Sequence, residues 1–158
     1  MKPDRIDLEI LRLLQQDGRL SSQALSEKVN LSARACLDRL RRLEAEGYIR
    51  GYTARIDRDK LGASISVFAQ VTLTDQRRAT RDRFESRIAR CDEVVACYLV
   101  SGEYDYLVRL VCADLAHYHR ITDAWIDDLT MSVARVVSNA ELQTVKEFSG
   151  VPGAFFER

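Results

Sequence analysis

A short basic stretch near the N-terminus holds the side chains best suited to chemistry. Arg34, Asp38 and Arg41 recur at helical spacing, so a helix would present them on one face. A guanidinium can form two parallel hydrogen bonds with a guanine edge, and a carboxylate can accept one from a cytosine amine. We therefore expect Arg34 and Asp38 to contact bases. We expect Arg39, Arg41 and Arg42 to meet phosphates or acidic side chains, and phosphate contacts position a protein without specifying sequence.

Two short helices and a tight turn, within the stretch 20–47, are predicted to hold these residues. Ser21 or Ser22 can cap the first helix and Ser32 the second, because a side-chain oxygen accepts a hydrogen bond from the unpaired amides of a first turn. Asn30 tolerates the left-handed conformation that a sharp turn requires. The pattern predicts a helix-turn-helix whose second helix enters the major groove of double-stranded DNA. The expected DNA-binding residues are Ser21, Ser22, Ser32, Ala33, Arg34, Leu37, Asp38, Arg39, Arg41 and Arg42.

The same pattern has a plainer interpretation, because paired short helices also occur in proteins that never bind DNA. The overall charge does not decide between the two, since the chain has 24 basic and 24 acidic residues. Residues 1–60 hold 13 basic and 10 acidic residues, whereas residues 61–158 hold 11 and 14. This modest asymmetry makes the N-terminal part the better partner for a polyanion.

A family resemblance favours the DNA-binding interpretation. The run NLSARACLDRLRRLEAEGYIRGYTARID, residues 30–57, resembles the recognition helix and following segment of the Lrp/AsnC, or feast/famine, family of regulators. Asn30 stands where the family usually has glycine, and Cys36 occupies an apolar position. The matching residues are Asp7, Ile10, Leu11, Leu14, Gly18, Arg19, Leu31, Ser32, Arg39, Leu43, Glu44, Gly47, Ile49, Gly51 and Tyr52.

The rest of the sequence alternates between strand and helix patterns. A first helix over 4–16, which Asp4 can cap, would complete a three-helix, winged helix-turn-helix domain, residues 1–60, with a short linker strand over 50–56. The order strand, helix, strand, strand, helix, strand then predicts a ferredoxin-like α+β domain, residues 61–158. The C-terminal tail, 150–158, is expected to be disordered or to dock on a neighbouring subunit. The expected strands are 65–74, 94–100, 104–112 and 135–145, and the expected helices contain Phe84 and Ile88, and Leu115 to Leu129.

The run VSGEYDYLV, residues 100–108, resembles a family hairpin that helps to line an amino-acid effector pocket. Gly102 lets the backbone approach a ligand closely, free amides near the turn suit a carboxylate, and Asp105 suits an ammonium group. The alternative is a plain hairpin in which Asp105 satisfies nearby amides. The expected effector-binding residues of this loop are Ser101, Gly102, Glu103, Tyr104 and Asp105.

By the same resemblance, the last strand contributes Ser138, Asn139 and Ala140 to the effector pocket. Glu141, which follows them, stands where the family more often has an aliphatic residue. It would either face solvent or give the pocket a preference for a basic or polar ligand. The sequence leaves both options open.

Enzyme and metal sites are not indicated. His117 and His119 lie two residues apart on a predicted helix and therefore point in different directions. The sequence has no phosphate-binding glycine loop, no nucleophile elbow and no zinc spacing, so we expect no cofactor, no metal and no catalytic residue. The four cysteines lie in or beside apolar runs, as buried thiols of a cytoplasmic protein would. No apolar run is long enough to span a membrane.

These patterns predict a cytoplasmic, sequence-specific DNA-binding transcriptional regulator. The resemblance implies a homodimer that assembles into an octamer or another higher oligomer and responds to an amino-acid effector. The alternative function is an amino-acid-sensing interaction module that acts on a protein partner rather than on DNA.

Overall fold

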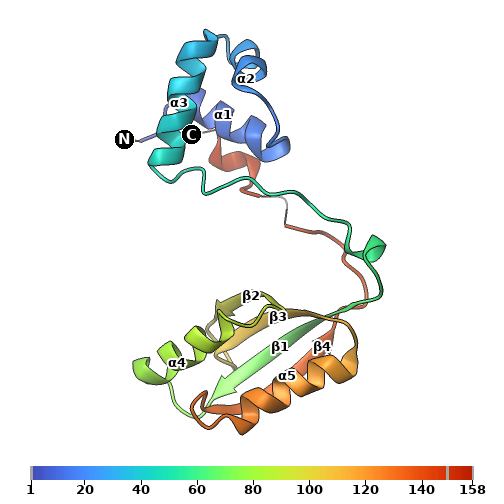
Figure 1. Cartoon of the computed structure of the whole chain (residues 1–158). Helices are drawn as coiled ribbons and strands as arrows, with labels where there is room; N and C mark the ends of the chain where they lie inside the picture. The colour runs from blue at the N-terminus through green and yellow to red at the C-terminus, as the bar shows by residue number, and fades with distance from the viewer. Residues whose placement is uncertain (1, 149, 158) are drawn as a thin grey trace. The chain divides into compact units, whose positions relative to one another are not determined.

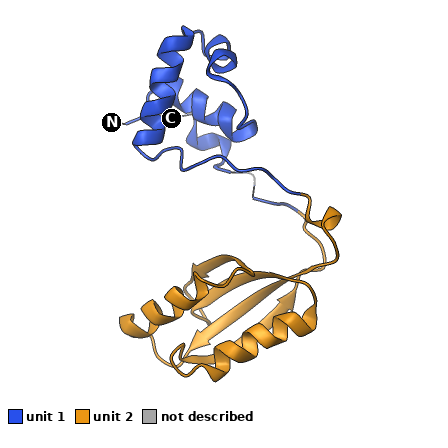
Figure 2. Cartoon of the chain, viewed as in Figure 1, with its two compact units in different colours: residues 1–56, 146–158 blue, residues 57–145 orange. Residues whose placement is uncertain are grey.

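The chain folds into two compact units in a computed structural model that describes residues 2–148 and 150–157 (Figure 1). Figure 2 shows the division: the helical unit comprises Met1–Ile56 and Lys146–Arg158, and the sheet unit comprises Asp57–Val145. Among the described residues, every helix is too short or too polar to cross a lipid bilayer. The two units together confirm the expected α+β class.

The helical unit is built from α1 (Arg5–Gln16), α2 (Ser22–Lys28) and α3 (Ala33–Ala45). The predicted side-chain caps are confirmed, because Asp4, Ser21 and Ser32 each accept a backbone hydrogen bond from the first turn that follows. The apolar stripes of these helices meet in one small core. Its fully buried members are Ile10, Leu25, Cys36 and Leu43.

Two residues with positive φ set the limits of α3. Asn30 adopts φ 54°, which turns the chain between α2 and α3 as predicted. Gly47 adopts φ 76° directly after the last helical residues. There the Gly47 amide donates to the Glu44 carbonyl and the Tyr48 amide donates to the Leu43 carbonyl, which is the Schellman arrangement of a helix end. A residue with a Cβ would be strained at this position.

The linker strand predicted over 50–56 is wrong. These residues have no regular secondary structure and are exposed, and the next element is a short 3₁₀ turn, η1 (Arg58–Lys60). Tyr48, Ile49 and Tyr52 alternate only loosely with polar residues, and this pattern suggested a strand. However, a strand needs a backbone partner, and none of the described residues pairs with this segment.

The sheet unit contains β1 (Ile65–Leu73), β2 (Val94–Leu99), β3 (Tyr106–Cys112) and β4 (Val133–Ala140). All pairings are antiparallel and the strand order is β2-β3-β1-β4. The connecting helices α4 (Arg78–Ile88) and α5 (Leu115–Asp127) pack on one face, which confirms the ferredoxin-like prediction. The core on that face includes Val67, Ala69, Val71, Phe84, Tyr106, Val108, Leu110, Tyr118 and Trp125.

Most predicted element ends of the sheet unit lie within two residues of the observed ends, and the end of the last strand differs most. The last strand ends at Ala140 instead of 145, because the Glu141 amide makes the final bond to the Ser66 carbonyl, near the start of β1. Beyond that point β1 offers no further backbone partner. The helix predicted to reach Leu129 ends at Asp127, and the Leu129 side chain is 87% exposed.

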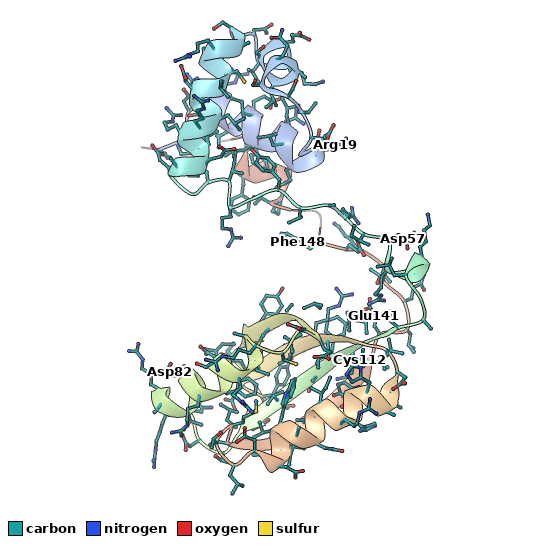
Figure 3. The ribbon with its side chains drawn as sticks, in the orientation of Figure 1. Arg19, Asp57, Asp82, Cys112, Glu141 and Phe148 are labelled. Atoms are coloured by element: carbon teal, nitrogen blue, oxygen red, sulfur yellow. The ribbon has the colours of Figure 1, made fainter. Side chains whose placement is uncertain are left out.

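The C-terminal tail returns to the helical unit of its own chain, where a short 3₁₀ turn, η2 (Gly153–Phe155), forms. The Gln15 side chain donates to the Val151 carbonyl at 2.8 Å and accepts from the Val151 amide at 2.7 Å. Docking on α1 replaces both expectations for this tail, disorder and contact with a neighbouring subunit. Residue 149 of the predicted second domain and residue 158 of the predicted tail lie outside the described residues. Phe148, which precedes the docked tail in the chain, is 89% exposed (Figure 3).

Candidate nucleic-acid interface and effector loop

The first turns of α3 present an exposed, partly basic surface. Arg34 is 80% exposed, and its Nε donates to the Asp38 carboxylate, one turn further along, at 3.2 Å. This bond leaves both Nη groups of Arg34 free to reach a base edge, while the carboxylate fixes the direction of the side chain. Arg41, another turn along, is also exposed. The predicted base-reading residues therefore share one accessible face.

Arg39 and Arg42 contact acidic side chains, which is one of the two kinds of partner that the sequence predicted for them. Arg39 Nη1 lies 2.6 Å from the Asp4 carboxylate and 2.8 Å from the Asp7 carboxylate. Arg42 Nη2 pairs with the second Asp7 oxygen. Asp7 is fully buried, so these two arginines fasten α3 to α1. These ion pairs place them to orient α3 relative to α1.

Asp4 and Asp7 also form a capping box at the start of α1, in which each carboxylate accepts from the amide of the other residue. The Asp7 amide, and after it the Arg39 guanidinium, hold the pKa of Asp4 below its ordinary value. Asp4 was expected as a cap and Asp7 as a family match, but neither was expected to be a partner of α3. An acidic pair at the spacing of a capping box was the available signal.

The remaining predicted DNA-binding residues line the same edge of the unit. Ser21 Oγ and Ser32 Oγ each accept a cap bond at 3.2 Å, from the amides of Ala24 and Ala35. Both serines are exposed, so their backbone amides and hydroxyls lie at the surface. Half-buried positions make up the rest of this set: Ser22, Ala33 and Leu37.

The predicted effector loop divides into exposed and buried parts. Ser101, Gly102 and Glu103 are exposed and Tyr104 is half-buried. Asp105 is only 9% exposed. Its carboxylate accepts from the Leu73 amide at 2.8 Å and from the Gln76 side-chain amide at 3.0 Å. The structure thus gives Asp105 the satisfied, structural role that the sequence offered as the alternative.

The structure does not bring the two parts of the predicted pocket together within one chain. The loop leads into β3 at Tyr106, which is paired with Val71 near the end of β1. Ala140 is paired with Val67, near the start of β1. Ser138 is paired with Ala69 of β1 and shares a hydrogen bond of 2.5 Å with the hydroxyl of buried Tyr118. Asn139 and Ala140 are exposed at the opposite end of the sheet from Ser101 and Gly102.

Glu141 belongs to a polar cluster on the sheet face that carries no helix. Its carboxylate lies 2.9 Å from Arg109 Nη2, whose Nε donates to Ser66 Oγ at 3.1 Å. Hydrogen bonds from Ser66 and Thr144, followed by Arg109, lower the pKa of Glu141 to about 2. Figure 3 shows Glu141 and Cys112 at the same end of the sheet. This internal ion pair replaces the solvent-facing option for Glu141.

Comparisons with known proteins agree with the division of the chain into a helical part and a sheet part. Residues 3–50 match a winged helix-turn-helix DNA-binding domain, and residues 66–151 match the Lrp/AsnC ligand binding domain. The Bkd operon transcriptional regulator of Pseudomonas aeruginosa is 49% identical over 115 residues, 73% of this chain and 75% of that protein.

Solved structures match over nearly the whole chain. An AsnC family transcriptional regulator from Agrobacterium tumefaciens superposes with a TM-score of 0.87 at 31% identity, covering 97% of this chain and 99% of that one. A transcriptional regulator from Neisseria meningitidis, solved as a complex with L-Met, gives a TM-score of 0.86 at 28% identity and covers 96% and 97%.

Proposed function

The chain belongs to the Lrp/AsnC family of transcriptional regulators, and from that premise we propose which of its residues bind DNA and the amino-acid ligand. The protein is a DNA-binding regulator with an amino-acid ligand-binding domain. Membership in a family of regulators also confirms that it is not an enzyme. We propose that it acts in the cytoplasm, where it binds DNA.

The observation that supports the proposal is that the arginines of α3 have two kinds of surroundings. Arg34 and Arg41 are exposed, whereas Arg39 and Arg42 form ion pairs with buried Asp7. A helix held in this way presents its N-terminal turns as a rigid body to the major groove. Arg34 reads a guanine, Asp38 accepts from a cytosine, and Arg41 meets a phosphate. Ser21, Ser22, Ser32, Ala33 and Leu37 complete the contact surface.

The proposed effector is a small amino acid. The loop residues Ser101, Gly102, Glu103 and Tyr104 bind it from one end of a sheet. Ser138, Asn139 and Ala140 bind it from the other end of a neighbouring chain's sheet. Support comes from the separation of the two groups in one chain. In this scheme Asp105 holds the loop in shape through Leu73 and Gln76, and the ligand joins neighbouring dimers.

The sheet face without helices is the proposed dimer contact. Side chains on this face alternate with the buried residues of the core, and several of them are apolar. Apolar side chains gathered on an uncovered sheet face suit a contact with a second copy of the chain. Two-fold pairing presents two α3 helices, which predicts half-sites about 34–36 Å apart or at a multiple of that spacing. Dimers then assemble into octamers or another higher oligomer. The apolar residues of the face are Phe68, Tyr98, Leu107, Val111 and Val137.

The experiment that tests the DNA contact is a binding titration of Arg34→Ala on a site selected with the wild-type protein. Loss of a bidentate base contact is expected to weaken specific binding by about 1–3 kcal/mol and to relax base preference at one position. Binding should also weaken steeply as the salt concentration rises.

Arg78→Ala is the matched control, because Arg78 and Asp82 form an exposed pair with the same one-turn spacing on α4. This variant should bind the selected site like the wild type. Unchanged specific binding by Arg34→Ala would reject Arg34 as a base reader.

A further inference from the structure

A hollow lies on the outer side of the helix layer of the sheet unit, between α4 and α5, with a volume of about 430 Å³. Its position follows from helical spacing, since His117, Ile121 and Trp125 are each four residues apart on α5 and share one face. The C-terminal end of α4 forms the opposite wall. This hollow is on the other side of the sheet from the proposed dimer contact, so dimerisation would leave it open.

The floor of the hollow is apolar. Trp125 and Met131 both line it, and they are 6% and 1% exposed, so little of either side chain is open to solvent. Ile121 adds a half-buried aliphatic side chain beside them. A ligand group that covers this floor would remove apolar surface from water, which is favourable.

The rim of the hollow is basic, and its charges are only partly neutralised. Arg87 lies 3.0 Å from the Asp128 carboxylate, and His117 lies 3.2 Å from that of Glu93. Two further arginines of the rim, Arg90 and Arg120, form no ion pair with any residue that the structure describes. Two guanidinium groups, one from the turn after α4 and one from α5, therefore face one opening without an anion.

We propose that this hollow is a second ligand site, which binds a carboxylic acid that carries an apolar group and no ammonium group. The carboxylate lies between Arg90 and Arg120, and the apolar group covers Trp125 and Met131. A branched aliphatic or phenyl group suits the volume, which falls in the lower part of the range for small-molecule sites. An amino acid is disfavoured, because Glu93 and Asp128 are already engaged and leave no carboxylate for its ammonium.

This chemistry separates the hollow from the proposed effector loop. There the ligand would be an amino acid held between chains, whereas here one chain supplies every contact. Two ligands of related carbon skeleton but different charge could thus be read by one protein. The site does not depend on DNA binding, so it can be tested whether or not the DNA proposal holds.

The chain contains one tryptophan, Trp125, so its fluorescence reports on this hollow directly. The experiment titrates the full-length protein with 3-phenylpropionate and, as matched neutral and cationic probes, with 3-phenylpropionamide and 3-phenylpropylamine. We expect a saturable change with the carboxylate and binding about tenfold weaker or more for the amide, since a hydrogen bond to a charged group is lost. The amine should not bind.

The double variant Arg90→Gln, Arg120→Gln should lose about tenfold or more in affinity for the carboxylate. The control is Arg78→Gln, Arg83→Gln, which removes two exposed arginines of α4 outside the hollow. Methyl-labelled methionine gives an independent signal, because Met131 and Met1 are the two methionines of the chain. The Met131 signal should shift with the carboxylate in the wild type and in the control.

Equal binding of carboxylate and amide, or unchanged affinity in the Arg90, Arg120 double variant, would overturn the proposal. So would the absence of any saturable response to 3-phenylpropionate or to 4-methylpentanoate. A change in the melting temperature of the double variant without ligand would indicate damage to the fold. In that case each single variant, Arg90→Gln and Arg120→Gln, is titrated, and both must weaken carboxylate binding.

Discussion

The helical unit and the sheet unit each bury an aspartate, and they satisfy it in opposite ways. Asp7 meets two guanidinium groups, Arg39 and Arg42, from a different helix. Asp105 meets two neutral amides, those of Leu73 and Gln76. A small three-helix core needs strong cross-links between its helices, and an ion pair supplies one. A four-stranded sheet already has a large core, so its aspartate only has to fix a loop.

Arginine-rich helices show the same contrast. In α3 some arginines are anchored while others stay exposed along one face. In α4, Arg78 pairs with Asp82 along the helix, and its arginines are spread around the helix. Arginine content alone therefore does not distinguish the two helices. The difference is the buried carboxylate of Asp7, which binds two arginines of α3.

Asp7→Ala should produce the largest effect of the changes considered for this comparison. Both guanidinium groups lose their shared buried partner, and breaking such a pair typically costs about 3 kcal/mol of unfolding free energy. Far-UV circular dichroism during urea unfolding measures the loss. The control Asp38→Ala removes an exposed pair and should change stability by less than about 1 kcal/mol. Similar losses in the two variants would remove the special role of Asp7.

Asp105→Ala should cost about 2 kcal/mol, because it leaves the Leu73 amide without its acceptor. Trp125 fluorescence follows this unfolding, since the tryptophan lies in the sheet unit. Asp105→Asn keeps one acceptor oxygen and should be closer to wild type. If Asp105→Ala were as stable as wild type but failed to bind an amino acid, Asp105 would be a ligand contact instead of a loop support.

Glu141→Gln tests the pH dependence of the sheet unit. The pKa of Glu141 is lowered from 4.5 to about 2 in the folded state, by Ser66, Thr144 and Arg109. A depressed folded pKa adds stability above the unfolded value, and this stability is lost as pH falls from about 4.5 toward 2. The variant should therefore be less stable than wild type by about 1 kcal/mol at neutral pH. That difference should shrink in this acidic window. A difference independent of pH would contradict the assignment.

Removing the tail contact should have the smallest effect. Gln15→Ala deletes two exposed hydrogen bonds to Val151, each contributing about 0.5 kcal/mol. Gly150→Ala should cost more, because Gly150 has φ 108° and a Cβ would overlap the Gln15 side chain. Hydrogen exchange of the Val151 amide measures the release of the tail. Exchange as slow in Gln15→Ala as in wild type would show that other contacts hold it.

Periodicity and capping residues fixed most of the secondary structure. The alternation from Ile65 to Leu73 marked a half-buried strand, and Ser32 and Gly47 bracketed the recognition helix. These signals are local, since each depends on residues within one or two turns. The same signals gave the wrong answer at 50–56 and at 141–145. There the pattern was present, but no neighbouring strand was available to pair with it.

The candidate sites could be located from the sequence more readily than the roles within them. The sequence showed the arginines of a predicted helix and the aspartate of a predicted turn. It also showed that each of these groups could contact either a ligand at the surface or another residue of the chain. The partner of each group lies far along the chain: Asp7 for Arg42, Gln76 for Asp105, Arg109 for Glu141. Only packing brings such pairs together.

The sequence by itself determined the two-part α+β design, the helix-turn-helix and the placement of its capped turns. Those features depend on propensity and short-range spacing. The tertiary structure decided which arginines are free, that Asp105 faces inward, that the tail docks on α1, and that Arg90 and Arg120 flank an apolar hollow. Charge pairing and burial act between residues distant in sequence, so no local pattern could settle them.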